Sequence, residues 1–355
     1  MKLTTGLAIE LIEHTETVCD ALYISEYECY VTASEDATVA IFFRQQDGRY
    51  TRHAAINTAS KATALSFDNK RSNLLIGLDN GLMLIVTIDL ETKSAKLAHQ
   101  LDIHKDRINY ITYNAEKDLI ISVGKDKMVR LYNPAKKTIV GGRFKKSVLL
   151  DCAYDPRYDR VFCASYDKVV RIGRYAERTA QVVELEAMKG HKGSVRAVDY
   201  NAESQILFTG SFDRTAAMWD VSQVGAAVFI RSFAGHLGKV KGVAYTDLET
   251  DLLFTTGDDG FARAFVASTG ECAKTWKVAS APVVGCRYYP ETHILLTFGQ
   301  DKVVRGWRVT TTLDVEPSMG EPVRTVDDLD YTGSAPVTAI PLGSHDLMDS
   351  DEEGL

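Results

Sequence analysis

The chain of 355 residues is 45% hydrophobic and 25% charged, which is the composition of a soluble globular protein with one large or two ordinary domains. It has no apolar run of about 18 residues, so we expect no transmembrane segment. The net charge is −7: residues 308–355 hold eleven acidic and two basic residues, a balance of −9, and the rest of the chain carries +2. This near-neutral remainder excludes a nucleic-acid binder that acts through bulk positive charge.

The first segment, MKLTTGLAIELIEH, carries glutamates inside its short apolar run, so we do not expect a secretory signal peptide. Residues 6–12 have the length of a single strand, and no repeat unit precedes them. The six cysteines form no CxxC pair, and most fall in predicted strands. We therefore expect reduced core thiols and a cytoplasmic location.

From there the chain repeats one unit, whose most constant feature is an Asp in a tight turn between two apolar runs. These aspartates are Asp36, Asp79, Asp126, Asp167, Asp213, Asp259 and Asp301. Their spacing of 41 to 47 residues is close to the period of repeats that each form one four-stranded sheet. The pattern predicts an all-β fold with almost no helix, namely a seven-bladed β-propeller over residues 1–309.

The two ends of the repeat region predict how the ring closes. We expect residues 6–12 to be the outer strand of the seventh blade, beside residues 303–309, because this arrangement leaves no open sheet edge. An eighth blade around Asp346 fails, since the chain continues only as LMDSDEEGL. Residues 310–355, with scattered prolines and many acids, are predicted to be an irregular acidic tail in which Ser350 is a candidate phosphorylation site.

The fifth repeat, residues 190–220, is the most complete copy. Its His191, Thr209, Asp213 and Trp219 predict a hydrogen-bond chain from the indole through the hydroxyl and the imidazole to the carboxylate. A Thr, a His and an Asp also suggest a nucleophilic triad, but a triad needs an open pocket, so we favour the structural role. The unit resembles the WD repeat.

The other repeats keep only parts of this set. The leading His is present as His14, His104, His191 and His236. The position of the Trp holds Phe42, Ile85, Tyr132, Gly173, Trp219, Phe265 and Trp307 in turn. We expect the second and fourth blades to depend more on apolar packing, and Gly173 to leave a gap that a neighbouring side chain fills.

Several strings resemble the propeller of the WD-repeat-and-FYVE-domain proteins. They are VTASEDATVAIF, NLLIGLDNGLM, ISVGKDKMVRLY, VFCASYDKVVRIG, LFTGSFDRTAAMWD and LLTFGQDKVVRGW. The resemblance implies a scaffold in endosomal vesicle traffic or kinase signalling. That family has a zinc-bound FYVE module, which binds phosphatidylinositol 3-phosphate, before its last blade. No paired CxxC motifs occur here, so we expect no zinc module, no metal site and no cofactor.

Basic residues cluster in the turns and in the loops that carry the leading His. The candidate partner-binding residues are Lys105, Arg107, Lys127, Lys145, Lys168, Lys192, Arg214, Lys239 and Lys302. We expect them on one face of the disc, where they suit an acidic peptide or a phosphoinositide headgroup. Exposed turns also favour Lys and Arg without any such role. A sharper hypothesis has the acidic tail fold back onto this face and compete with ligands.

The sequence contains no GxSxG, HExxH or P-loop motif, so we expect no enzymatic activity. The favoured function is a non-enzymatic scaffold or adaptor for other proteins, in the cytoplasm and, by resemblance, at the periphery of endosomes. Two alternatives stay open: a propeller that binds phosphoinositides at membranes, and a structural subunit of a large cytoskeletal or flagellar assembly. No partner is specified, because propeller specificity lies in exposed loop residues.

Overall fold

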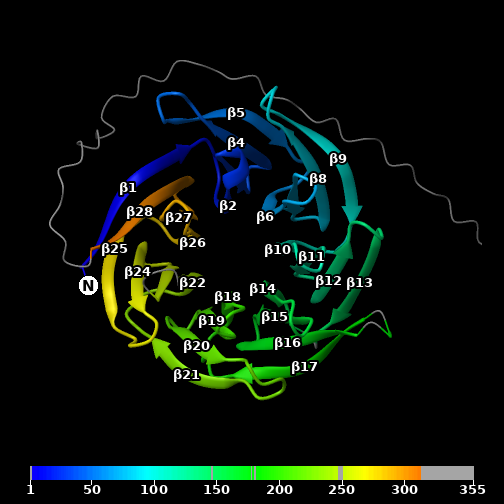
Figure 1. The fold of residues 1–355 in the computed structure, drawn as a ribbon, viewed down its shortest axis with the longest axis vertical. Coiled ribbons are helices and arrows are strands. Elements are labelled where there is room, and N and C mark those ends of the chain that lie inside the picture. The colour runs from blue at the N-terminus through cyan, green and yellow to red at the C-terminus, as the bar shows by residue number, and fades with distance from the viewer. Residues whose placement is uncertain (1, 145–146, 177, 180, 247–250, 313–355) are drawn as a thin grey trace, which may run out of the picture.

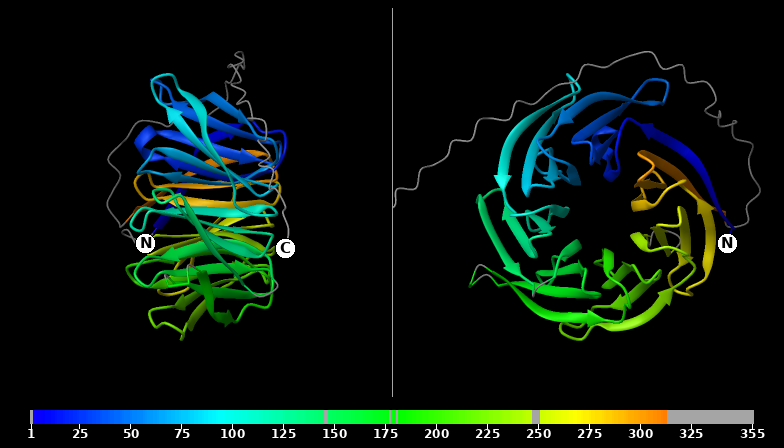
Figure 2. Two further views of the ribbon diagram at one scale, coloured as in Figure 1. Left: turned by 90° about the vertical axis from the view of Figure 1, so that its right-hand side faces the viewer. Right: turned by 180° about the vertical axis from the view of Figure 1, so that it is seen from behind.

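The structure is a computed structural model that describes residues 2–312 except 145–146, 177, 180 and 247–250. Within this part of the chain, 28 strands form a ring of blades around a central channel, and the only helical segment is the short 3₁₀ turn η1 (Ser25–Tyr27) (Figure 1). Seen from the side, the ring is a disc whose strands run across its thickness (Figure 2). The seven-bladed β-propeller is therefore confirmed.

The inner half of each blade consists of two strands. The innermost strands, which line the channel, are β2 (Val18–Ile24), β6 (Ala62–Asp68), β10 (Ile108–Asn114), β14 (Leu149–Asp155), β18 (Val195–Asn201), β22 (Val240–Thr246) and β26 (Val283–Tyr289). The second strands are β3 (Cys29–Ser34), β7 (Asn73–Leu78), β11 (Leu119–Gly124), β15 (Arg160–Ser165), β19 (Ile206–Ser211), β23 (Leu252–Gly257) and β27 (Ile294–Gly299). The second strands are almost wholly buried, because neighbouring blades cover both of their faces.

The outer half of each blade completes its sheet. The third strands are β4 (Thr38–Arg44), β8 (Leu82–Asp89), β12 (Met128–Asn133), β16 (Val169–Ala176), β20 (Ala216–Asp220), β24 (Phe261–Val266) and β28 (Val303–Thr312). The outer strands are β5 (Tyr50–Asn57), β9 (Ser94–Asp102), β13 (Thr138–Arg143), β17 (Gln181–Lys189), β21 (Val228–Phe233), β25 (Cys272–Lys277) and, for the last blade, β1 (Lys2–Ile12). Blade 1 comprises β2–β5, the numbering follows the chain, and blade 7 comprises β26–β28 with β1.

The N-terminal strand closes the ring as expected. β1 pairs with β28 in antiparallel register from Lys2 opposite Thr312 to Ile12 opposite Val303. Both strands are longer than the sequence suggested, since β1 begins at Lys2 rather than residue 6 and β28 continues beyond residue 309 to Thr312. The extension follows from a run of β-branched threonines that favours strand. The remaining tail, including Ser350, lies outside the described residues.

Blade 2 has a different register from the one that the sequence suggested. Asn80, not Asp79, occupies the turn position, because its Oδ1 accepts the N–H of Leu82 at 3.2 Å, as the turn Asp does in other blades. Gly81 follows with φ +91°, a left-handed conformation that glycine adopts without strain. An Asn-Gly pair is a strong hairpin signal, and the preceding Asp obscured it.

The next strand of blade 2 is displaced by the same one residue. The bulge in β8 lies between Ile85 and Val86, whereas the corresponding bulge of blade 5 lies immediately before Trp219. Val86, rather than Ile85, therefore holds the position of the Trp. Both side chains are buried, so the expectation that this blade depends on apolar packing is unaffected.

In blade 4 a neighbouring ring fills the space beside Gly173, as expected. A Cβ at Gly173 would lie 2.2 Å from Cζ of Phe144, which is fully buried. Blade 5 shows the reverse arrangement, since a Cβ at Gly190 would lie 2.5 Å from Cη2 of Trp219. Phe144 and Gly190 both precede the turn Asp by 23 residues. One aromatic ring therefore fills the same site from the loop in blade 4 and from the strand in blade 5.

Blades 3 and 4 are joined at their outer edges, which the sequence did not predict. β13 and β17 pair in parallel at Gly141 and Gln181, so the two blades form one eight-stranded sheet. The close approach needs glycine, because a Cβ at Gly142 would lie 1.9 Å from the carbonyl oxygen of Val182.

Candidate functional site: the His–Asp face

Blade 5 contains the hydrogen-bond chain that its sequence suggested. The indole Nε1 of Trp219 donates to Oγ1 of Thr209 at 3.0 Å, and Nε2 of His191 lies 2.8 Å from the same oxygen. Nδ1 of His191 is 2.8 Å from Oδ2 of Asp213. A carboxylate only accepts, so Nδ1 carries the proton and Nε2 accepts from the Thr209 hydroxyl. All four groups are occupied by this structural contact.

The turn carboxylate of blade 5 is held in its charged form. Burial alone would raise the pKa of Asp213, but hydrogen bonds from His191, Thr215 and the N–H of Lys192 hold the pKa well below its usual range. The carboxylate therefore ties the leading loop to the turn. This tie places the leading loops and the Asp turns on one side of the disc, which we call the His–Asp face.

Three other blades make the same connection. Their contacts join His14 to Thr32 (2.7 Å) and Asp36 (3.0 Å), His104 to Ser122 (2.9 Å) and Asp126 (2.9 Å), and His236 to Thr255 (2.9 Å) and Asp259 (3.0 Å). The same loop and turn geometry therefore recurs in blades 1, 3, 5 and 6.

In blades 4 and 7, which lack the leading His, an arginine takes over the turn Asp. Arg305 reaches Asp301 at 2.5 Å, and Arg171 pairs with both Asp167 and Glu184. Each arginine stands four residues after its Asp on the following strand. Blade 4 thus depends on an ion pair as well as apolar packing. The strings YDKVVR and QDKVVR contain this Asp–Arg spacing, but a comparison of the repeats by their leading His does not detect it.

The Asp turns fix the backbone of four predicted cations. Lys127, Lys168, Arg214 and Lys302 have φ values of 70°, 73°, 73° and 69°. These left-handed conformations follow directly after the turn Asp. In each blade the residue before the turn position donates its N–H to a carbonyl of the leading loop, for example Phe212 to Ser194 at 2.9 Å. The cations therefore stand on a rigid frame.

The predicted cations differ in solvent exposure and in whether they form ion pairs. Lys105, Lys168, Lys192, Arg214 and Lys302 are exposed, and Lys127 is half-buried. Nζ of Lys239 lies 4.8 Å above the ring of Phe212. Arg107 is half-buried and paired with Asp79 at 3.2 Å and Glu35 at 3.6 Å, so its charge is already neutralised. Lys145 lies outside the described residues.

Apolar side chains add to this face over blades 4 to 6. Tyr166 and Leu237 are 60% and 82% exposed, and Ser194 of blade 5 donates to the carbonyl of Tyr166 at 2.7 Å. Both side chains are uncharged, so the charge pattern that predicted this face did not include them. Their positions beside the turn Asp and after the leading His could have revealed them.

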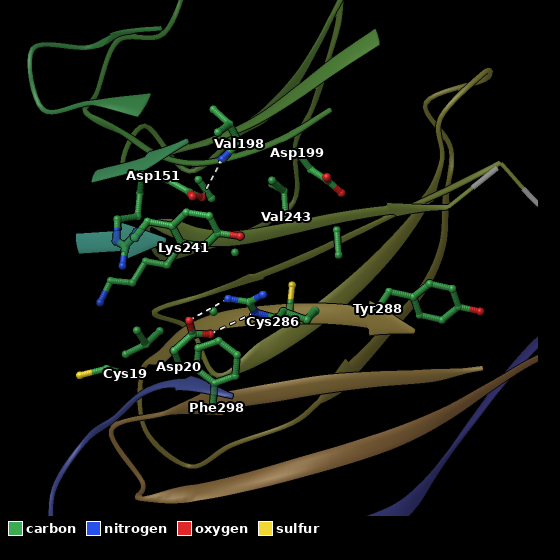
Figure 3. Close-up of a pocket in the computed structure, with 18 of the residues that line it drawn as sticks. Cys19, Asp20, Asp151, Val198, Asp199, Lys241, Val243, Cys286, Tyr288 and Phe298 are labelled. Atoms are coloured by element: carbon green, nitrogen blue, oxygen red, sulfur yellow. Dashed lines mark hydrogen bonds and ion pairs between the residues drawn. The ribbon is translucent and has the colours of Figure 1, made fainter. Parts of the chain in front are cut away.

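The central channel holds a cavity of about 260 Å³ lined by the innermost strands (Figure 3). Asp20 of blade 1 binds Arg287 of blade 7 at 2.7 and 3.1 Å, and accepts the N–H of Leu65 of blade 2 at 2.8 Å. Asp151 points to the N–H of Val198 at 3.0 Å (Figure 3). These carboxylates connect neighbouring blades across the inner wall.

The ionisable groups of the channel suit structure better than catalysis. Burial raises the pKa of Asp151 to about 7, and it raises the pKa values of the Cys19 and Cys286 thiols to about 11 and about 12. Thiols with such pKa values are protonated near neutral pH and are poor nucleophiles.

Comparison with known proteins agrees with this architecture. The family pattern described as "WD domain, G-beta repeat" matches residues 95–133 and 183–220. The crystal structure of the WD40 beta propeller domain of Doa1 superposes with a TM-score of 0.73 at 15% identity, covering 85% of this chain and 96% of that one. Two segments of this chain thus match the WD40 repeat, and its fold is that of a WD40 propeller.

Curated relatives are similar to this chain at low identity. The mouse "WD repeat and FYVE domain-containing protein 1" is 24% identical over 264 residues, which cover 74% of this chain and 63% of the relative. The human "WD repeat and FYVE domain-containing protein 2" is 25% identical over 206 residues, covering 58% and 51%. The maize "Guanine nucleotide-binding protein subunit beta" is 22% identical over 235 residues. The chain thus spans less than two thirds of the length of the two relatives named for a FYVE domain.

Two features of the described residues bear on membrane and metal chemistry. In the part of the WD40 propeller that the structure describes, no helix is long and apolar enough to cross a membrane. Among those same residues, no group of three or more His, Cys, Asp or Glu side chains is placed to hold a metal ion.

Proposed function

We propose that this WD40 protein is a non-enzymatic scaffold that binds acidic segments of partner proteins on its His–Asp face. The observation that carries the proposal is a set of cations without ion pairs to any other described residue. They are the exposed side chains of Lys105, Lys168, Lys192, Arg214 and Lys302. Charges held on rigid turns attract acidic ligands without the entropic cost of ordering a loop.

The neighbouring apolar groups support a protein partner. Tyr166 and Leu237 offer exposed apolar surface beside Lys168 and Lys239. Aromatic anchors ringed by polar contacts are typical of protein interfaces. A scaffold role also agrees with the absence of a catalytic motif in the sequence.

Affinity purification tests this proposal. The triple variant K168E/K192E/R214E should lose, at least tenfold, the partners that the unmodified chain retains at physiological salt. The matched control K70E/K96E/K137E reverses three exposed lysines away from the His–Asp face, in the turn before β7, in β9 and in the turn before β13, and should retain them. An unchanged partner set with the first variant would reject the His–Asp face as the binding surface.

A phosphoinositide-binding propeller is the second candidate, because the same cations suit phosphate groups. Cytoplasmic residence at the periphery of endosomes belongs to this proposal and rests on the relatives named for a FYVE domain. Flotation with vesicles that contain 5% phosphatidylinositol 3-phosphate separates the two candidates. If the fraction of protein that floats is the same with and without this lipid, the lipid candidate is rejected.

A further inference from the structure

A second cavity, of about 290 Å³, lies between blades 3 and 4. Its lining comes from the turns before β11, β13 and β15 and from the adjoining ends of the strands, on the side opposite the His–Asp face. We call it the inter-blade pocket. β13 forms part of its wall, and the pairing of β13 with β17 ties blade 3 to blade 4 at this junction. The pocket is therefore preformed.

The inter-blade pocket combines an apolar wall with free positive charge. Leu131 is fully buried, and Leu119 and Val140 are half-buried. Lys136 and Arg174 are exposed beside them and form no ion pair with another described residue. A ligand that satisfies both parts must carry an aliphatic group next to an acidic one.

Asp159, the acidic residue that lines the pocket, does not neutralise Lys136 or Arg174. Asp159 is 3.2 Å from Nζ of Lys117 and accepts the hydroxyl of Tyr154 at 2.8 Å. Its charge is thus neutralised within the protein. The volume is at the small end of the range for small-molecule pockets, about 300–1,000 Å³, so it suits one or two side chains of a peptide better than a large cofactor.

We infer that the inter-blade pocket binds a short acidic peptide with an aliphatic side chain, and that residues 343–355 of this chain are that peptide. Their sequence, GSHDLMDSDEEGL, has five acidic residues, no Lys or Arg, and the adjacent Leu347 and Met348. Thirty residues separate Thr312 from position 343. A chain of that length reaches up to about 100 Å, which is enough to cross the disc.

The assignment pairs specific groups. Leu347 or Met348 fills the apolar wall, and Asp346 and Asp349 on either side meet Lys136 and Arg174. The proposal is independent of the His–Asp face, because the two surfaces lie on opposite sides of the disc. It replaces the earlier hypothesis that the tail covers the cations of that face.

Photo-crosslinking in the full chain tests the inference. p-Benzoylphenylalanine at Thr138, an exposed residue that lines the pocket, should crosslink to residues 343–355, as mapped by mass spectrometry. The same group at Lys192 on the His–Asp face should not. No crosslink from position 138 to this segment, or an equal crosslink from position 192, would overturn the proposal.

Charge variants make the test specific. K136E/R174E should lower the crosslink yield from position 138 at least fivefold, whereas K96E/K277E, which reverses two exposed outer-strand lysines, should leave it unchanged. D346K/D349K should lower the yield equally, and combining it with K136E/R174E should restore it. A yield that ignores the pocket charges overturns the site even if the partner-binding role of the His–Asp face stands.

Discussion

In blade 5 the hydroxyl of Thr209 lies between one donor, the indole of Trp219, and one acceptor, the imidazole of His191. Its hydroxyl accepts from Trp219 and faces Nε2 of His191. Valine has nearly the same shape but cannot replace either contact. We expect Thr209→Val to lower the free energy of unfolding by about 2–3 kcal/mol, because it leaves buried polar groups unpaired. Chemical denaturation followed by tryptophan fluorescence measures the loss.

The control for this prediction is an exposed threonine in blade 2. Thr87 bonds Asn73 at 3.0 Å at the surface, where water replaces the contact. Thr87→Val should change stability by less than about 0.5 kcal/mol. Equal losses for the two variants would show that the blade 5 chain adds no more than a surface hydrogen bond.

Asp151 makes stability depend on pH in the opposite direction from most carboxylates. Burial raises its pKa to about 7, so between pH 4 and pH 7 the folded chain holds a proton that the unfolded chain has lost. Stability therefore falls as pH rises through this window, by up to about 1.4 kcal/mol per pH unit, and levels off above it. We expect Asp151→Asn to remove this part of the slope.

The measurement compares the two chains at pH 5 and pH 8. The substitution also disturbs the bonds to the N–H groups of Val198 and Cys152, so it destabilises at both values. The diagnostic quantity is the difference, which should be larger at pH 5 than at pH 8. A difference that is the same at both values would mean that Asp151 is ionised throughout.

At the scale of elements, the junction of β13 and β17 depends on a missing side chain. A Cβ at Gly142 collides with the carbonyl of Val182, so Gly142→Val should separate the two strands. We expect backbone amides of residues 181–183 to exchange with solvent at least tenfold faster by mass spectrometry. Gly6→Ala is the matched control, because a Cβ at Gly6 meets nothing within 4 Å. Unchanged exchange in the first variant would contradict the pairing.

The sequence predicts the features that recur in every repeat. It does not predict the residues that replace a missing repeat residue from another position in the chain. Strand order, the Asp turns and the chain through His191 follow from a period that every copy shares. Arg171 and Phe144 replace a missing His and a missing Trp from other positions in the chain. Such replacements depend on three-dimensional proximity, which spacing alone does not encode. For the same reason the inter-blade pocket, built from two blades, was not foreseen.

At the scale of the molecule, charge alone was a partial guide to the His–Asp face. The distribution of lysines and arginines in the sequence predicts the exposed cations. It does not show that acids of the two preceding blades neutralise the charge of Arg107. Charge also gives no indication of Leu237, because the exposure of this side chain depends on the conformation of its loop. The face as a unit was predictable, whereas the state of each of its side chains was not.

The ring depends on β1, because this N-terminal strand completes the sheet of the last blade. Leu3 and Leu11 are buried in two separate core clusters, at about 1.5–3 kcal/mol each. Deleting residues 2–12 should therefore lower the thermal midpoint and leave the edge of β28 free to pair with another chain. We expect concentration-dependent self-association by analytical ultracentrifugation, reversed by an excess of the 1–12 peptide. Deleting residues 345–355 removes the same number of residues and should not cause self-association. A monomeric, fully stable chain without β1 would show that other contacts keep the ring closed.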